Sequence, residues 1–308
     1  MEKANSQGII SPAYHTFHGE NVDSRFYYAY FRSKNFINKD LKPHVYGIRD
    51  GRSIDIEGMK TIKIPCTSYA EQKSIGDFLT TLDHLITLHQ RKYDKLQVLK
   101  KAMLEKMFPK NGSSVPEIRF KGFTDAWEQR KFSDLYAPLV ERNSDLLPYN
   151  KTLSVATMTY KTDGNGAADS SLANYKRLRT GDIAFEGHTS KSFRYGRFVL
   201  NDVGDGIMSP RFSALRPLAQ MPTNFWKYYI HYEPIMRKIL VASTKAGTMM
   251  NELVIDEFLK SSVLVPSIEE QTRIGSILKN IDNLITLHQR ELEKLQNIKK
   301  SMLEKMFV

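Results

Sequence analysis

Cysteine is almost absent from the sequence, which has only Cys66 among its 308 residues. A single thiol excludes an internal disulfide framework and any zinc cluster built from cysteines. Long apolar runs are absent too, since none approaches the roughly 20 residues that a membrane-spanning helix needs. The first residues, MEKANSQGII, lack the charged-then-apolar pattern of a signal peptide. Together these features predict a soluble, cytoplasmic protein without a membrane partner.

The motifs of common catalytic and cofactor sites are also missing. The chain has no G-x-x-x-x-G-K-[ST] phosphate loop, no G-x-G-x-x-G turn that opens a helix after a strand, and no H-E-x-x-H zinc motif. Asp182 and Glu186 lie among cations, which favours ion pairs with Arg179 or Lys191 over an acid–base pair. We therefore expect no catalytic residues and no metal. An unrecognised nuclease or methylase site is the least favoured hypothesis.

Positive charge is in excess. Lysine and arginine number 45 against 34 aspartates and glutamates, and the pI is near 9.4. Such a balance makes a polyanion such as nucleic acid the first partner to consider, although a merely basic soluble protein would show the same numbers. With 41% hydrophobic and 11% aromatic residues, the chain can form packed cores.

The most informative feature is an internal repeat. Residues 71–108 match residues 270–307 at 24 of 38 positions without a gap, at an offset of 199, and both copies contain LITLHQR. Apolar residues recur at alternating spacings of four and three, which predicts two long amphipathic helices over 68–108 and 268–308. The predicted seam includes Leu82, Ile86, His89, Tyr93 and Leu96 in the first copy and Ile281, Ile285, His288, Leu292 and Leu295 in the second.

Each copy begins with the same helix-start signal. Ser68 with Glu71, and Ser267 with Glu270, form S-x-x-E capping boxes at equivalent positions. A helix of about 39 residues is roughly 58 Å long and must bury its apolar stripe, so each copy is the obvious partner of the other. A short linker at 109–114 leads from the first helix into the next domain, which predicts that the two helices run antiparallel.

The repeat extends upstream with less identity. GIISPAY at 8–14 resembles GIMSPRF at 206–212, and FYYAYFRSKNF at 26–36 resembles FWKYYIHYEPI at 225–235. Residues 115–198 have no counterpart. The chain therefore reads as one and a half copies of a unit, of which the first lacks its beginning.

Residues 115–135, VPEIRFKGFTDAWEQRKFSDL, resemble the start of a target-recognition domain in the specificity subunits of type I restriction-modification systems. GDIAFEG, DGIMSP and VPSIEEQTRIGSIL then follow in the order of that family, before the long helix. The resemblance covers essentially the whole chain. It implies an α+β fold in which mixed α/β recognition domains are separated by two antiparallel helices that form a coiled-coil spacer.

The resemblance also implies a domain order. We expect an incomplete first recognition domain at 1–67, spacer helices at 68–108 and 268–308, and a complete second recognition domain at 115–267. About 84 residues of the first domain are expected to be missing before Met1. A half-subunit of this kind is expected to self-associate or to pair with another specificity fragment.

The function implied by the resemblance is recognition of part of a bipartite DNA target. The chain would bind double-stranded DNA and methyltransferase subunits, and through these the restriction subunits. The assembled complex would be an adenine-N6 DNA methyltransferase and an ATP-dependent type I deoxyribonuclease. S-adenosylmethionine, ATP and Mg²⁺ are expected on the partners, and this chain is expected to bind no cofactor.

The densest basic segment is 175–197, which mixes cations with aromatic residues. DNA contacts need cations for phosphates and forked or amide-type side chains for base edges. A solvated basic loop would show the same composition, but the family resemblance favours contact. The candidate DNA-binding residues are His188, Ser190, Lys191, Arg194, Arg177, Arg179, Arg211 and Lys245.

An alternative hypothesis is a coiled-coil adaptor that acts mainly through protein association and has little DNA specificity.

His89 and His288 could be metal ligands, but two histidines without carboxylate or thiol neighbours make a poor site. A role in setting the register of the paired helices is the preferred interpretation.

Overall fold

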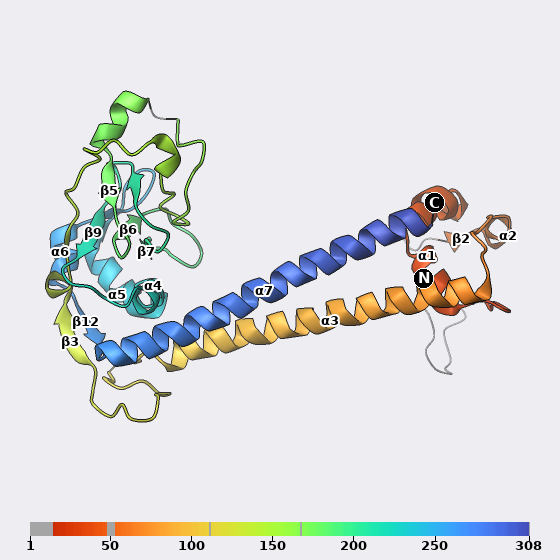
Figure 1. Ribbon diagram of the computed structural model, residues 1–308, viewed down its shortest axis with the longest axis horizontal. Helices are drawn as coiled ribbons and strands as arrows, with labels where there is room; N and C mark the ends of the chain where they lie inside the picture. The colour runs from red at the N-terminus through yellow and green to blue at the C-terminus, as the bar shows by residue number, and fades with distance from the viewer. Residues whose placement is uncertain (1–14, 48–52, 111, 167, 308) are drawn as a thin grey trace. The chain divides into compact units, whose positions relative to one another are not determined.

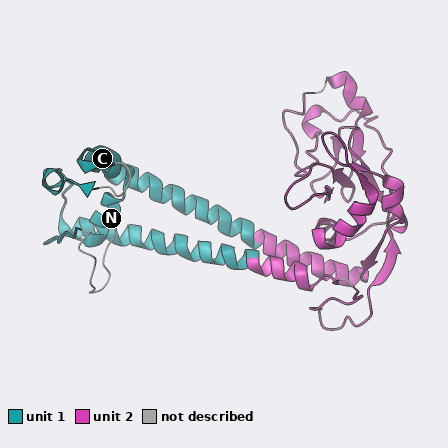
Figure 2. Ribbon diagram, turned by 180° about the vertical axis from the view of Figure 1, so that it is seen from behind, with its two compact units in different colours: residues 1–97, 284–308 teal, residues 98–283 magenta. Residues whose placement is uncertain are grey.

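The computed structural model describes residues 15–47, 53–110, 112–166 and 168–307. The chain forms two compact units (Figures 1 and 2). Unit 1 consists of residues 1–97 and 284–308, and unit 2 of residues 98–283. The segment 8–14, in which the sequence predicts a counterpart of 206–212, lies outside the described residues.

Unit 2 is built on a four-stranded antiparallel sheet in the order β4-β9-β6-β7. Two-stranded pairs add β5 to β8, β3 to β12 and β10 to β11. The sequence segments DIAFEG, GRFVLN and SSVLVP, which predict strands, correspond to β6, β7 and β12. The bounds are β3 Glu128–Lys131, β4 Tyr136–Pro138, β5 Lys176–Leu178, β6 Ile183–Glu186, β7 Arg197–Leu200, β8 Gly206–Met208, β9 Ala214–Pro217, β10 Thr244–Lys245, β11 Glu252–Leu253 and β12 Ser262–Val265.

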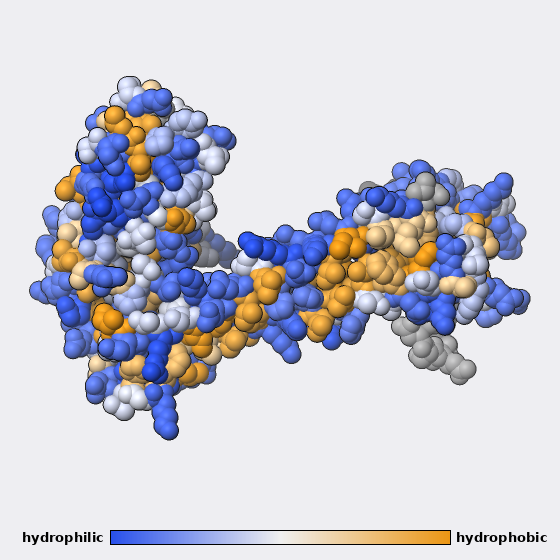
Figure 3. Space-filling model, viewed as in Figure 1, coloured by the Kyte–Doolittle hydropathy of each residue, from blue (hydrophilic) through white to orange (hydrophobic). Residues whose placement is uncertain are grey.

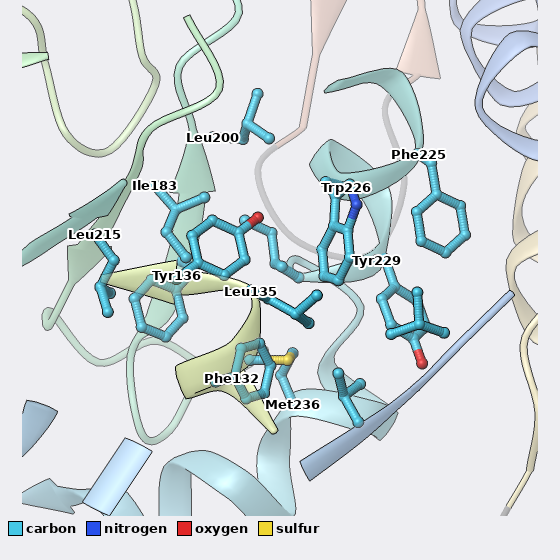
Figure 4. Close-up of a cluster of buried hydrophobic side chains, with 14 of the residues drawn as sticks. Phe132, Leu135, Tyr136, Ile183, Leu200, Leu215, Phe225, Trp226, Tyr229 and Met236 are labelled. Atoms are coloured by element: carbon cyan, nitrogen blue, oxygen red, sulfur yellow. The ribbon is translucent and has the colours of Figure 1, made fainter. Parts of the chain in front are cut away.

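Three short helices pack on this sheet: α4 Thr223–Tyr229, α5 Glu233–Ser243 and α6 Ile255–Lys260. Figure 4 shows the aromatic core between them and the strands. In that core Tyr136 of β4 meets Trp226 of α4 edge-on, with ring centroids 5.7 Å apart. Burial of so much aromatic surface is the main stabilisation of the domain that holds the candidate site.

Short 3₁₀ turns lie at Phe132–Asp134, Tyr149–Lys151 and Asp169–Asn174.

Unit 1 contains α1 Ser24–Phe31, the helical turns η1 Phe36–Leu41 and η2 Lys42–His44, the strands β1 Val45–Tyr46 and β2 Ser53–Ile54, and α2 Ile56–Lys60. Its core is again aromatic, and it includes Phe26, Tyr30 and Phe36. Most of α3 (Tyr69–Lys106) and the C-terminal part of α7 (Ile268–Met306) complete the unit.

The 199-residue repeat is also a repeat of structure. Adding 199 to the number of the first residue of α1, β1, β2 and α2 gives the first residue of α4, β10, β11 and α6, respectively. The ends of the long helices follow the same rule. Phe307 packs on Phe26 in unit 1, with centroids 5.1 Å apart, and its equivalent Phe108 packs on Phe225 in unit 2 at 6.0 Å. The upstream similarity predicted from the aromatic residues is therefore confirmed.

A glutamine at equivalent positions anchors the start of each long helix, and a glycine allows α7 to pack closely. The side chain of Gln72 accepts from the Asp23 amide at 3.0 Å in unit 1, and that of Gln271 accepts from Trp226 Nε1 at 3.0 Å in unit 2. A methyl group on Gly275 would lie 2.5 Å from the Phe225 amide nitrogen. The absence of a side chain thus lets α7 pack closely against the first turn of α4.

The capping boxes form only in half. Ser68 Oγ accepts from the Glu71 amide, and Ser267 Oγ accepts from the Glu270 amide, each at 3.3 Å. The glutamate side chains turn elsewhere, because Glu71 binds the Thr67 hydroxyl and Glu270 binds Arg119. The tertiary ion pair of Glu270 is the stronger interaction, so it replaces the reciprocal contact of the predicted motif.

The long helices α3 and α7 run antiparallel, as predicted. In unit 1, Lys299 pairs with Asp83 and His288 contacts His89, so residue numbers rise along one helix and fall along the other. In unit 2, the equivalent pair Lys100–Asp282 is 2.7 Å apart. All the seam residues predicted in both helices are buried or half-buried.

His89 and His288 are equivalent residues of the two copies, and they meet across the seam with their Nδ1 atoms 3.1 Å apart. One nitrogen donates and the other accepts, so the contact requires at least one neutral ring. Burial lowers the pKa of His288 from its usual value, with a further contribution from the charge of His89. This geometry fits a residue pair that sets the register of the helices.

Lowering the pH should weaken the helix pair. A histidine whose pKa is lower in the folded state contributes stability that is fully present above its ordinary pKa of about 6.5 and is lost as the pH falls from that value through the lowered pKa. We expect the urea midpoint of unfolding to fall between pH 8 and pH 5. The double variant His89→Asn/His288→Asn should show a smaller decline, and an equal decline would contradict the assignment.

Candidate nucleic-acid interface

The candidate site lies at one end of the four-stranded sheet of unit 2. Strand β6 ends at Glu186, and a loop over residues 187–196, which we call the reading loop, leads into β7. Residues 188–192 and Arg194 are exposed, whereas Gly187 and Gly196 at the ends of the loop are buried. The strands thus hold both ends of the loop and present its polar centre to solvent.

Three neighbouring segments form hydrogen bonds with the ends of the reading loop or with the strands beside it. The Phe185 amide donates to Ser213 O at 2.8 Å, which places the turn 209–213 beside the loop. The Asn251 amide donates to Gly187 O at 2.9 Å, which adds the β10–β11 hairpin. Arg197 Nη2 donates to Ala156 O at 3.0 Å and adds the turn 154–159. Segments far apart in the sequence therefore form one surface.

This surface brings six predicted residues together. His188, Ser190, Lys191 and Arg194 lie in the reading loop, Arg211 lies in the adjoining turn, and Lys245 lies in the hairpin. All six are exposed. Four of them are cations, and such a cluster on one end of a sheet can neutralise the closely spaced phosphates of a nucleic acid.

The reading loop has internal order. The imidazole of His188 contacts the carboxylate of Glu186, which is buried and also accepts from the His188 amide at 3.1 Å. Ser190 and Phe193 exchange backbone hydrogen bonds of 3.1 and 3.2 Å. These bonds limit the conformations of the loop, so its exposed side chains are presented from a defined backbone.

A second set of contacts supports the base of the loop. Phe193 packs against His231, with ring centroids 4.9 Å apart, and the Arg197 guanidinium lies 4.9 Å from the Phe193 centroid. His231 Nδ1 is 3.2 Å from Phe198 O, and burial lowers the pKa of His231. A neutral imidazole can therefore anchor the apolar side of the loop.

The structure places Arg177 and Arg179 away from this surface. The side chain of Arg177 is only 10% exposed and pairs with Asp145 and Asp205 at 2.9 and 3.0 Å. Arg179 lies in the turn before β6, at the opposite end of that strand, and pairs with Glu141 at 2.7 Å. We therefore leave both out of the interface, because a phosphate contact would have to break existing ion pairs.

The sequence predicts ion pairs for Asp182 and Glu186 with Arg179 or Lys191, and the structure gives both carboxylates other side-chain partners; Glu186 contacts the imidazole of His188. Arg216 pairs with Asp182 at 2.8 Å and also with Glu141, and the two arginines around Glu141 lower its pKa to about 2. The Asp182 carboxylate serves the fold, as expected from its cationic surroundings.

Sequence reasoning missed Asn251 and most of the hairpin tip. Asn251 donates from Nδ2 to Arg194 O at 3.1 Å in addition to its backbone bond. The available signal was Gly247 in the short run AGTMMN, because a glycine between two extended segments indicates a turn. Lys245 lies opposite Glu252 in the β10–β11 register, so its charge is partly offset.

Among the residues that the structure describes, no group of three histidine, cysteine, aspartate or glutamate side chains is arranged to hold a metal ion. Within the same residues, no helix has both the length and the hydropathy required to cross a bilayer.

The sequence matches the family described as "Type I restriction modification DNA specificity domain" over residues 5–98 and 190–297. These two ranges contain the equivalent halves of the internal repeat, including most of both long helices. The second range includes residues 190–196 of the reading loop, the Arg211 turn and the β10–β11 hairpin.

Two curated proteins of Methanocaldococcus jannaschii are similar along most of the chain. The putative type I restriction enzyme MjaX specificity subunit is 22% identical over 292 residues, and the MjaVIII specificity subunit is 22% identical over 305. The alignments cover 90% and 91% of this chain but 66% and 68% of those proteins. The chain thus spans about two thirds of the length of these relatives.

A solved structure has the same fold. The S subunit of a type I restriction-modification system from M. genitalium superposes with a TM-score of 0.59 at 16% sequence identity. The match covers 94% of this chain and 73% of that one.

Proposed function

The chain belongs to the family of type I restriction-modification DNA specificity domains, and on that premise we propose that it recognises part of a bipartite DNA target through unit 2. The observation that carries the proposal is the gathering of exposed Lys191, Arg194 and Arg211 with His188 and Ser190 at one end of the sheet. Cations there can bind phosphates, and the forked or hydroxyl-bearing side chains can reach base edges.

Selection from random double-stranded DNA by the full chain at fixed salt tests this proposal. We expect a short motif to be enriched over several rounds, because base-edge contacts discriminate among sequences whereas phosphate contacts do not. Retention of DNA without any enriched motif would contradict the proposal and would favour an adaptor with little specificity.

We further propose that the long helices carry docking patches for methyltransferase subunits. In unit 1, the side of each LITLHQR segment that does not face the other helix is exposed to solvent. Leu88 and Leu287 are therefore exposed at equivalent positions of the repeat, and Leu284 lies beside Leu287. Figure 3 shows apolar side chains at the surface of these helices. Two exposed leucines at equivalent positions of the repeat suit two copies of one partner.

Replacing Leu88 and Leu287 by serine should weaken assembly with methyltransferase subunits by about tenfold or more, because each leucine would lose apolar burial at the contact. Leu287 is 51% exposed in the chain, so its replacement should leave the unfolding midpoint nearly unchanged. Analytical ultracentrifugation with the partner would measure the effect. Unchanged assembly would contradict the proposed patches, and DNA selection by the free variant serves as the control.

The remaining expectations concern the assembled complex. The chain would contribute no catalytic residue, and partner subunits would supply adenine-N6 methylation and ATP-dependent cleavage with S-adenosylmethionine, ATP and Mg²⁺. Restriction subunits would bind through the methyltransferase subunits. A second specificity fragment, or a second copy of this chain, would provide the other half of the target recognition.

A further inference from the structure

The β10–β11 hairpin is part of the candidate interface, yet the sequence points only to Lys245 within it. Its strands are two residues each, and they carry a six-residue tip at 246–251. A two-stranded antiparallel ribbon is one of the two shapes that the major groove of DNA admits. Residues 245–249 are exposed, so the tip is free to enter a groove.

Asn251 ties the hairpin to the reading loop. Its amide donates to Gly187 O at 2.9 Å, and its side-chain Nδ2 donates to Arg194 O at 3.1 Å. A methyl group on Gly187 would lie 2.1 Å from Asn251 O, so only glycine allows this close approach. The hairpin tip and Arg194 are therefore presented to a ligand as a single surface.

The tip exposes an apolar side chain among small ones. Met249 is 78% exposed, and it follows Ala246, Gly247 and Thr248. Its unbranched thioether side chain adapts its shape to a contact surface. In the major groove, the apolar group of the base pattern is the 5-methyl group of thymine. A methionine held beside cations at the end of a ribbon has the chemistry to contact that group.

The first half of the chain contains the equivalent strand pair. Strands β1 and β2 pair Val45 with Ile54, and β10 and β11 pair Thr244 with Leu253 at the positions 199 residues later. The sequences between the paired strands, GIRDGR at 47–52 and AGTMMN at 246–251, share no residue at equivalent positions. The long helices share 24 of 38. A copied strand pair whose connecting sequence diverges is the pattern expected when the tip at 246–251 contacts base pairs that are specific to its own half of the target.

We infer that the β10–β11 hairpin is a second DNA-reading element, in which Met249 contacts a thymine methyl group in the major groove and Asn251 is a positioning residue. This inference rests on the proposed function. It assigns one preference to the DNA target, namely a thymine next to the base pairs that the reading loop contacts.

The test uses the full chain and the motif enriched from random DNA. Each thymine of that motif is replaced in turn by uracil, which lacks only the methyl group. Wild-type protein should lose about fourfold in affinity at one thymine, the value for one buried methylene-sized group. Met249→Ala should bind the thymine probe more weakly and show no further loss with uracil at that position. Met249→Leu should retain the discrimination.

A matched control is Leu218→Ala. Leu218 is 58% exposed and follows β9 at the end opposite the Arg211 turn. This variant should show the wild-type uracil profile. Asn251→Ala should reduce discrimination both at the thymine and at the adjacent positions, with an unchanged dependence of affinity on salt, because the phosphate contacts remain.

The outcomes separate the two proposals. If the wild-type chain enriches no motif, the proposed function fails, and this inference fails with it. If a motif is enriched but lacks thymine, or if Met249→Ala keeps the wild-type uracil profile, only the inference on the hairpin is overturned. If Asn251→Ala keeps full discrimination at every position, its positioning role is overturned.

Discussion

Replacement of Lys191, Arg194 and Arg211 together by alanine is expected to lower DNA affinity by roughly two to three orders of magnitude in 0.1 M salt. Each phosphate contact to duplex DNA makes the negative slope of log affinity against log salt steeper by about 0.9. This corresponds to an affinity that is about eightfold higher per cation at that salt concentration. The three side chains are exposed, and none forms an ion pair among the described residues, so their charges are available to a ligand.

The measurement is a salt titration of binding to the selected motif and to a scrambled duplex. The magnitude of the slope should decrease by about three in the triple variant for both duplexes. Arg179→Ala is the matched control, because Arg179 is also an exposed arginine of the same domain but is paired with Glu141 at the opposite end of β6. Its affinity should stay within about twofold of wild type. An unchanged slope in the triple variant would place the DNA on another face.

The single variant Arg119→Met is expected to destabilise unit 2 by about 3–5 kcal/mol, which is the usual effect of leaving a buried charge without its partner. Arg119 forms a bidentate pair with Glu270, with Nε at 2.7 Å and Nη2 at 2.8 Å from the carboxylate oxygens. The side chain of Glu270 is 1% exposed and that of Arg119 is 12% exposed. The pair joins the segment after α3 to the first turn of α7.

Urea unfolding of the full chain, followed by tryptophan fluorescence, would measure this effect, because Trp127 and Trp226 are both buried in unit 2. The double variant Arg119→Met/Glu270→Leu should recover most of the lost stability, since replacing both partners of a buried pair by apolar side chains is often neutral or stabilising. Equal destabilisation by the single and the double variant would show that packing of the arginine stem, rather than the uncompensated carboxylate, sets the cost.

The scaffold was largely predictable because its signals are local or repeated. Helical periodicity depends on neighbours three and four residues apart, so the seam through Leu82, Ile86 and His89 could be read along the chain and checked against its second copy. The same holds for the helix starts at Ser68 and Ser267. The contacts of the glutamate side chains could not be predicted, because a tertiary contact from Arg119 competes for the carboxylate of Glu270.

The sequence by itself therefore determined two long antiparallel helices, an α+β recognition domain and a basic segment with the composition of a DNA-binding loop. Only the tertiary structure decided which cations are available. Arg177 and Lys191 look alike in the sequence, but the fold brings Asp145 and Asp205 to Arg177 and leaves Lys191 exposed. The tertiary structure also decided that the hairpin meets the reading loop, through the hydrogen bonds of Asn251 to Gly187 O and Arg194 O. Residues so far apart along the chain carry no local signal of such a contact.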